Sequence, residues 1–366
     1  MRGSIMLAAA LAAHPVGAAA PFDVPPAPDG DRPLVAWMPG TVQCDGAVVG
    51  PVTMRRPLTR LGWSGSMPQI ASLAVSFDID QAGRPLSIRR VSPEFRPFSE
   101  DVLPSLAASR FPAGDARAGC RITYTHRMTA MTDTPVEDLV SYSLYRPDGA
   151  LPWSGWNRIF TMNGNCADRP LPPPLVQVYP DFQKIPATPG SRDWSMVTYD
   201  QNARGRTRNV RTLYSTGNAA LDAASVKAMR ASRHSGGARA GCVYPYWRAP
   251  MRLAAPPSPD TKSLRPTTSN CDASDDTYAT QPRLTYPEAY SKRSIEGWAI
   301  VAFDVAPWGE LGNLRVLASQ PSEDFGQQAL QVLRSARKAP SQAGRVGCVD
   351  KVVFRMGPTD EEASAL

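Results

Sequence analysis

Apolar and polar residues alternate in short stretches of the chain, most clearly at 75–80. Apolar Val75, Phe77 and Ile79 take every second position there, and 301–305 repeats the pattern. A period of two is typical of a strand with one buried face.

A helical period appears further along. Within 325–336 the apolar positions fall on one helical face, at Phe325, Ala329, Val332, Leu333 and Ala336. Weaker versions lie at 221–229 and at 102–107, where Pro104 must occupy the first turn. These stretches predict amphipathic helices.

The six cysteines show that these elements belong to a repeat. They form three pairs with almost the same internal spacing: Cys44 and Cys120, Cys166 and Cys242, Cys271 and Cys348. Three landmarks recur inside the pairs: an aspartate after an aromatic residue (Asp78, Asp200, Asp304), a glycine five positions later (Gly83, Gly205, Gly309) and a glycine before the second cysteine (Gly119, Gly241, Gly347). We therefore predict an α+β protein of three tandem modules, each β-β-α-β with an antiparallel sheet and one helix on a face.

The landmarks set the predicted boundaries. We expect a signal peptide at 1–20, a first module at 21–135, a second module at 136–250, a proline-rich linker at 251–270, a third module at 271–358 and a polar tail at 359–366. Proline-rich sequence is extended and semi-rigid, so we expect modules that fold separately.

The repeat also predicts the cysteine pairing. Only Cys44–Cys120, Cys166–Cys242 and Cys271–Cys348 give every module the same disulfide. A thiol relay or a metal site is the alternative, but no two cysteines have the close spacing that such sites use.

The third module carries a family resemblance. Tyr286-Pro287 opens it, an apolar strand follows Gly297, and a turn at Gly309 precedes a second strand at 314–316. This order resembles the TonB C-terminal domain. The second module keeps only the Tyr-Pro opening, and the first lacks it.

The resemblance implies a function and a site. It implies peptide recognition by strand addition, linked to TonB-dependent outer-membrane transport, with receptor segments as the expected partners. It also points to the last strand of the third module as the binding edge, with Val349, Val352, Val353, Phe354 and Met356 as its residues. In the second module Pro245 interrupts the corresponding strand, because proline has no N–H to donate.

The N-terminus predicts the compartment. Arg2 precedes the apolar run 5–13, and Ala18 to Ala20 offer a small-residue cleavage site. We expect cleavage after Ala20, export to the periplasm and no transmembrane span in the mature chain. TonB keeps an uncleaved membrane helix, so the expected role is that of a periplasmic accessory, decoy or scaffold.

Charge and chemistry narrow the function further. The net charge is +7, but Lys and Arg are scattered along the sequence, which favours solubility and weak attraction to anionic envelope material over nucleic-acid binding. We expect the recurring aspartates to face water, and Trp153 and Trp156 to pack the chain between two modules rather than to anchor a partner. No nucleophile, histidine-acid pair or cofactor motif appears, so we predict no catalytic residue, metal or cofactor. A structural protein that binds peptidoglycan or a membrane surface, and an enzyme with an unrecognised site, remain alternatives.

Overall fold

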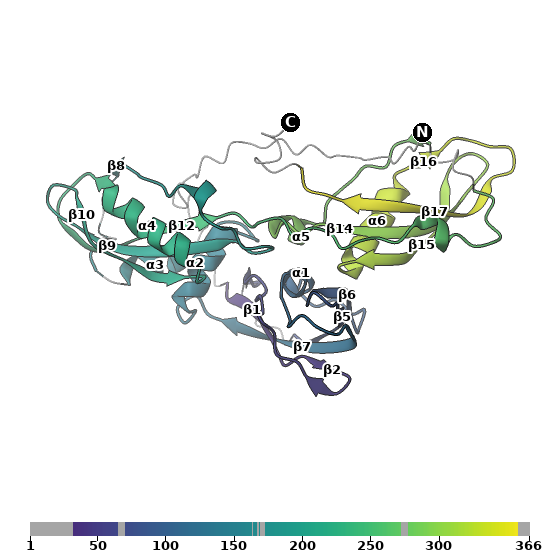
Figure 1. Cartoon of the computed structure of the whole chain (residues 1–366). Helices are drawn as coiled ribbons and strands as arrows, with labels where there is room; N and C mark the ends of the chain where they lie inside the picture. The colour runs from purple at the N-terminus through teal and green to yellow at the C-terminus, as the bar shows by residue number, and fades with distance from the viewer. Residues whose placement is uncertain are drawn as a thin grey trace.

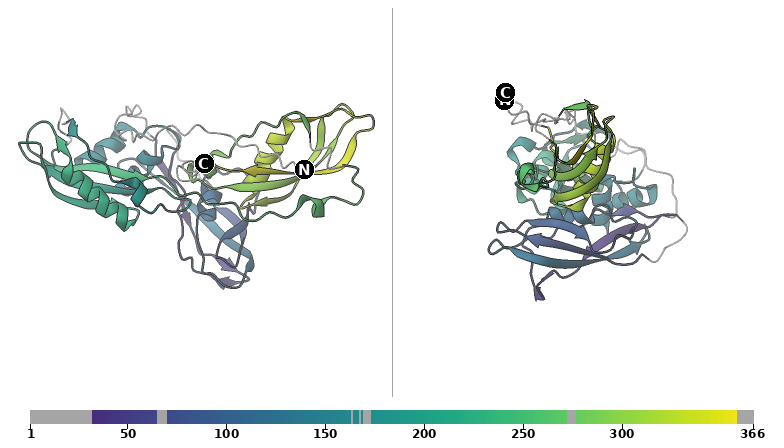
Figure 2. Two further views of the ribbon diagram at one scale, coloured as in Figure 1. Left: turned by 45° about the horizontal axis from the view of Figure 1, so that its top comes forward. Right: turned by 90° about the vertical axis from the view of Figure 1, so that its right-hand side faces the viewer.

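The computed structural model describes residues 32–64, 70–162, 164–166, 168, 173–271 and 277–357. Small antiparallel sheets, each packed with a helix, form repeated modules, which confirms the predicted α+β class (Figure 1). The second and third modules lie at opposite ends of the molecule, with the first between and below them (Figure 2). The expected signal peptide and polar tail lie outside the described residues.

The first module has the largest sheet. Its strands are β1 (Leu34–Pro39), β2 (Gln43–Cys44), β3 (Ala47–Val48), β4 (Arg60–Leu61), β5 (Leu73–Ile79), β6 (Pro85–Arg90) and β7 (Arg117–Thr129). The long strand β7 pairs with β5 on one edge and with β1 and β2 on the other. Helix α1 (Val102–Ala107) is buried along its whole length.

The second module begins with two helices that the repeat does not predict, α2 (Val136–Tyr145) and α3 (Trp153–Thr161), and Trp156 is buried among their apolar residues. Its sheet has the order β10-β9-β12, from β9 (Asp193–Gln201), β10 (Thr207–Ser215) and β12 (Arg239–Arg248). Helix α4 (Ala219–Ala231) covers one face, and β8 (Pro174–Val176) pairs with β11 (Arg233–His234) beside it. A 3₁₀ turn, η1, spans Phe182–Lys184.

The third module repeats this plan. Its sheet has the order β15-β14-β17, from β14 (Gly297–Val305), β15 (Leu311–Gln320) and β17 (Arg345–Phe354). Helix α6 (Glu323–Arg334) packs on the sheet, and the predicted apolar face from Phe325 to Ala336 is buried. The short elements are β13 (Tyr278–Thr280), α5 (Glu288–Lys292) and β16 (Arg337–Lys338).

All three predicted disulfides are present. They join Cys44 to Cys120, Cys166 to Cys242 and Cys271 to Cys348, across 76, 76 and 77 residues. Each links the segment that enters a module to its final strand. Closing a loop of this length stabilises a module by about 4 kcal/mol in the chain-entropy model.

The recurring aspartates have a structural role that differs from our expectation. Asp78, Asp200 and Asp304 each accept a hydrogen bond from the backbone N–H of the glycine before the second cysteine, at 3.0, 2.9 and 2.8 Å. These glycines have φ of 64°, 68° and 69°, and each lies at a shift in strand register. The aspartate therefore fixes a glycine bulge at the start of each final strand, instead of being satisfied by water alone.

Buried apolar clusters extend across the module boundaries, so the modules pack against one another, and their separate folding stays a prediction. One cluster of buried apolar residues continues from the first module into the third, and another joins the first to the second. Strand β6 also hydrogen-bonds to the third module, where the Ile88 N–H donates to the Pro321 carbonyl at 3.0 Å.

A buried ion pair holds this junction. The Arg293 guanidinium is 1% exposed and donates from Nε to Asp101 Oδ1 at 2.7 Å. It also donates to the carbonyls of Arg56 and Gly190. One side chain of the third module thus connects to both of the others.

The proline-rich linker is not a free spacer. Leu253 forms a parallel bridge with Ile295, and the Pro256 carbonyl accepts a hydrogen bond from Trp298 Nε1 at 2.7 Å. The 3₁₀ turn η2 (Thr261–Leu264) follows, and Leu264 packs against the apolar cluster on the sheet face opposite α6. The linker therefore covers the back of the third sheet.

Candidate functional site

The predicted binding edge is the outer edge of β17. Within the described residues β17 pairs only with β14, from Gly297 opposite Phe354 to Val305 opposite Arg345. The Lys351 N–H donates to the carboxylate of its neighbour Asp350 at 3.0 Å instead of to a strand. Because backbone groups alternate in direction along an antiparallel strand, Val349 and Val353 direct theirs outward together with Lys351.

The side chains predicted for this edge have different environments. Val349 is 5% exposed on the back of the sheet, Val352 packs against the helix-side core, and Phe354 is buried against Phe325. Met356 lies beyond the end of the strand. The edge can therefore offer backbone groups and Val353, which is half-buried, while most of the predicted side chains serve packing.

The edge has a defined beginning. The Val346 N–H donates to Asn270 Oδ1 at 2.7 Å, and the Asn270 N–H donates to the Val346 carbonyl at 3.3 Å. This cap, beside the Cys271–Cys348 disulfide, occupies the first residues of the strand. Strand addition would start beyond it, at about Val349.

In the first module, another strand of the chain occupies the corresponding edge. Residues Leu34–Pro39 of β1 pair with Tyr124 to Thr129 of β7. The Gly40 N–H donates to the Thr123 carbonyl at 2.9 Å. Thr123 stands three residues after the second cysteine, as Lys351 does. The chain itself supplies the added strand here.

The second module shows the edge interrupted. Strand β12 lies at the edge of its sheet, and Pro245 sits opposite Met196 within it. Pro245 also stands three residues after its cysteine. A proline is tolerated there because this position directs its backbone nitrogen away from β9.

A second recurring position was missed in the sequence. The N–H groups of Phe111, His234 and Lys338 donate to the carbonyls of the equivalent turn glycines. Phe111 packs on Phe77, and His234 stacks on Tyr199 with its Nε2 3.2 Å from the hydroxyl. The chemistry at this position differs between modules, which hid the equivalence.

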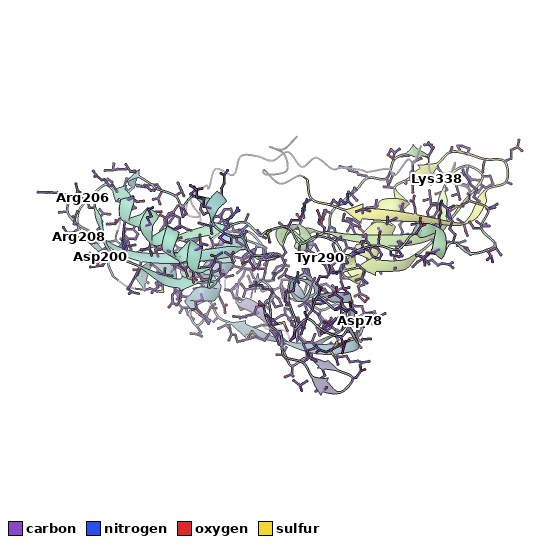
Figure 3. All side chains as sticks on the ribbon, viewed as in Figure 1. Asp78, Asp200, Arg206, Arg208, Tyr290 and Lys338 are labelled. Atoms are coloured by element: carbon purple, nitrogen blue, oxygen red, sulfur yellow. A yellow bond between two sulfur atoms is a disulfide. The ribbon has the colours of Figure 1, made fainter. Side chains whose placement is uncertain are left out.

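In the third module this position holds a buried cation. Lys338 is 4% exposed, and its Nζ lies 3.8 Å from both the Tyr278 ring centroid and Asp350 Oδ2. The Tyr278 hydroxyl donates to the same carboxylate oxygen at 2.6 Å. Figure 3 marks Lys338 within the third module. The group anchors β16 to β17, so it supports the edge strand from the helix side.

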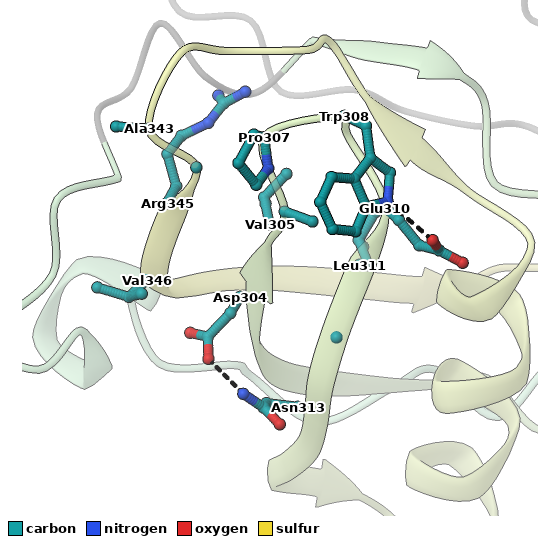
Figure 4. A pocket seen from close by; sticks show the side chains of 13 residues that line it. Asp304, Val305, Pro307, Trp308, Glu310, Leu311, Asn313, Ala343, Arg345 and Val346 are labelled. Carbon is teal, nitrogen blue, oxygen red and sulfur yellow. Dashed lines mark hydrogen bonds between the residues drawn. The ribbon is translucent and has the colours of Figure 1, made fainter.

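A shallow cavity of about 410 Å³ lies at the far end of the third module (Figure 4). Its polar side chains bond to one another: Asn313 donates to Asp304 at 2.7 Å, and Trp308 Nε1 donates to Glu310 at 3.0 Å. This arrangement shows no nucleophile with a base. Among the described residues no group of three or more His, Cys, Asp or Glu side chains could hold a metal ion.

Comparison with known proteins finds a related domain in the third module. Residues 282–355 match the family model described as Gram-negative bacterial TonB protein C-terminal. The chain is 32% identical to Protein TonB of Klebsiella pneumoniae over 108 residues, which is 30% of this chain and 42% of that protein. It is also 32% identical to Protein TonB of Escherichia coli over 76 residues, 21% of this chain and 31% of that protein. The chain thus spans less than half the length of these relatives.

Two further observations concern location. The family match and the three disulfides together indicate the cell envelope, where disulfides persist. In the part of the chain that the structure describes, no helix has both the length and the apolar composition needed to cross a bilayer.

Proposed function

We propose that the chain is a periplasmic adaptor that binds extended peptide segments by strand addition to the outer edge of β17. Segments of TonB-dependent receptors are the proposed partners, in connection with outer-membrane transport. The observation that carries the proposal is the contrast between edges: the chain fills this edge in the first module, whereas no strand among the described residues pairs with it in the third.

The chemistry of the edge supports this reading. An added strand gains main-chain hydrogen bonds, and Val349, Lys351 and Val353 direct such groups outward. Both ends of the strand are fixed, by Asn270 near Val346 and by the bond from the Met356 N–H to Glu296 at 3.0 Å. An edge held in this way loses little entropy when a peptide pairs with it.

A proline substitution tests the proposal. Lys351→Pro removes an outward donor at the position where the second module carries Pro245, so the strand is expected to form normally. The probes are synthetic peptides that cover the periplasm-facing plug segment of a TonB-dependent receptor, titrated into the full chain. We expect affinity to fall at least about tenfold, because a donor is lost and the ring obstructs the pairing strand.

Two variants complete the experiment. Lys351→Ala removes the side chain but keeps the N–H, and its affinity should stay within about threefold of the wild type. Val353→Pro blocks the next outward donor and should abolish binding. Unchanged binding in both proline variants would contradict the proposal, as would binding that appears only after Pro245→Lys in the second module.

A further inference from the structure

Two cations lie at the outer edge of β17, on the side of the sheet that the linker covers. Ile300 pairs with Lys351 and Trp298 with Val353, and both partners on β14 belong to the apolar cluster on that side. Cross-strand partners share a face, so the side chains of Lys351 and Val353 project to the linker side. The alternation continues to Arg355, directly after the end of β17. Lys351 and Arg355 are exposed, and Val353 lies half-buried between them.

The chain does not pair these two cations with acids of its own. Within the described ranges no carboxylate lies within ion-pair distance of Lys351 or Arg355. The Lys351 Nζ donates a hydrogen bond to Ser258 Oγ at 2.9 Å, so its partner in the linker is neutral. Both positive charges are therefore available to a strand that pairs with this edge.

Two acids beside the edge are engaged with other groups. Asp350 lies on the helix side of the sheet, with its Oδ2 3.8 Å from Lys338 Nζ. Glu296 accepts a hydrogen bond from the Met356 N–H at 3.0 Å and lies 3.8 Å from the Arg252 guanidinium. Each of these carboxylates thus has a cation of its own and holds part of the fold.

The first module pairs the equivalent cation with an acid. Counted from the second cysteine of each module, Arg127 corresponds to Arg355. Arg127 lies opposite Ala36 of β1, and its guanidinium donates to Asp138 Oδ2 at 3.1 Å. The chain therefore supplies both the neighbouring strand and the acid in the first module. In the described part of the third module it supplies neither.

The first module also shows the register of a strand at this edge. The residues that lie beside the equivalents of Arg355, Val353 and Lys351 are Ala36, Met38 and Gly40. The middle one is apolar and half-buried. A peptide in the same register places its residues i, i+2 and i+4 beside the three side chains of the third module, and this spacing is the same in either direction of the peptide.

We propose that the edge of β17 selects extended peptides with the pattern acid-x-apolar-x-acid. The two carboxylates pair with Lys351 and Arg355, and the apolar residue between them packs on Val353. Opposite charges and apolar pairs on neighbouring strands stabilise their pairing, whereas like charges destabilise it. This inference rests on the proposed strand addition and adds the chemical class of peptide that the edge would take.

The test uses two capped peptides that differ only in charge, Thr-Glu-Thr-Val-Thr-Glu-Thr and Thr-Lys-Thr-Val-Thr-Lys-Thr, titrated into the full chain at low salt. Each opposite-charge pair strengthens binding roughly threefold, and each like-charge pair weakens it by a similar factor. The wild type should therefore bind the glutamate peptide at least about tenfold more tightly than the lysine peptide. Lys351→Glu/Arg355→Glu replaces two exposed side chains, so it should fold, and it should reverse this preference.

A charge-matched control separates the edge from the net charge. Lys227→Glu/Arg230→Glu changes two exposed cations of α4, at the opposite end of the molecule (Figure 1), and the preference should stay within about threefold of the wild type. A reversal in this control as well would overturn the proposal, because net charge alone would then account for the preference.

The variant Lys351→Pro distinguishes selectivity from strand addition. If the wild type binds both peptides equally and Lys351→Pro weakens both, strand addition stands and the selectivity is refuted. If neither peptide binds the wild type, or if Lys351→Pro weakens neither, both strand addition and its selectivity are refuted.

Discussion

The first and third modules place the same final strand in different surroundings. In the first, β1 and the Gly40 N–H occupy the outer edge of β7. In the third, no strand in the described part of the chain pairs with the corresponding edge of β17 beyond Val346. The strands share the glycine bulge, the disulfide and the buried face. The difference teaches that the repeat encodes the unit, while the segment that enters each module decides whether its edge is available to a partner.

The largest expected effect tests whether β1 is an integral strand. Trp37 is fully buried on β1, so Trp37→Ala should destabilise the first module by about 3–5 kcal/mol. Met38→Ala, on the half-exposed face of the same strand, should cost less than about 1 kcal/mol. Urea unfolding followed by tryptophan fluorescence would measure both. A small cost for Trp37→Ala would mean that β1 is loosely held and that the first edge is also accessible.

The next effect concerns the buried ion pair that joins the third module to the first. Arg293→Ala leaves Asp101 buried without its partner and should cost about 3–5 kcal/mol. Arg315→Ala, at an exposed position, should change stability by less than about 0.5 kcal/mol. Thermal unfolding should show the first and third modules losing stability together. If only the third module responded, the shared core would contribute little.

A smaller effect is expected at Asp304, the copy of the recurring aspartate in the third module. A hydrogen bond from Asn313, and then one from the Gly347 N–H, lowers the pKa of Asp304. Since the folded-state pKa is depressed, the stabilisation is present above the unfolded value, near 4, and is lost as pH falls through the lower folded value. We expect Asp304→Asn to cost about 1 kcal/mol at neutral pH and to flatten the acid dependence of the third module. An acid dependence identical to that of the wild type would exclude this carboxylate as its source.

The smallest effect is a pH dependence of the stability of the second module, caused by His234. Burial lowers the pKa of His234, so its neutral form is favoured in the folded state. The unfolded chain then binds more protons below about pH 6.5, and the second module should lose stability as the pH falls through this range, by at most about 1.4 kcal/mol per pH unit. His234→Phe, which introduces the residue of the first module, should remove this dependence between pH 7 and 5. Hydrogen exchange of the second module at the two pH values would measure it.

Much of the fold could be predicted because it depends on local pattern. Alternation at Val75, Phe77 and Ile79 and the helical face from Phe325 to Ala336 each reflect burial on one side of a single element. The disulfides followed from the repeat because symmetry limits pairing more strongly than spacing does. The bond between each aspartate and its bulge glycine was missed, although both recur, because the two are far apart in sequence and meet only across paired strands.

Contacts between modules could not be predicted in this way. Nothing near Arg293 in the sequence points to Asp101, and Leu253 lies in a proline-rich stretch that gives no sign of pairing with Ile295. The candidate edge was predicted as a strand, but the burial of Val349 and Phe354 could not be predicted, because it depends on the linker and the helix that cover them.

The cover that β1 provides has a consequence for the kinetics of folding. Leu34 pairs with Thr129, and the apolar cluster of the first module is completed by residues of the third. Because the chain is synthesised from its N-terminus, the first module must wait for partners that are made later. Pairing across long sequence separations is slow. Until β7 has been made, β1 would carry unprotected edges that other chains could join. The first module should thus be the last to become protected, and a chaperone that shields strand edges would accelerate maturation of the whole protein.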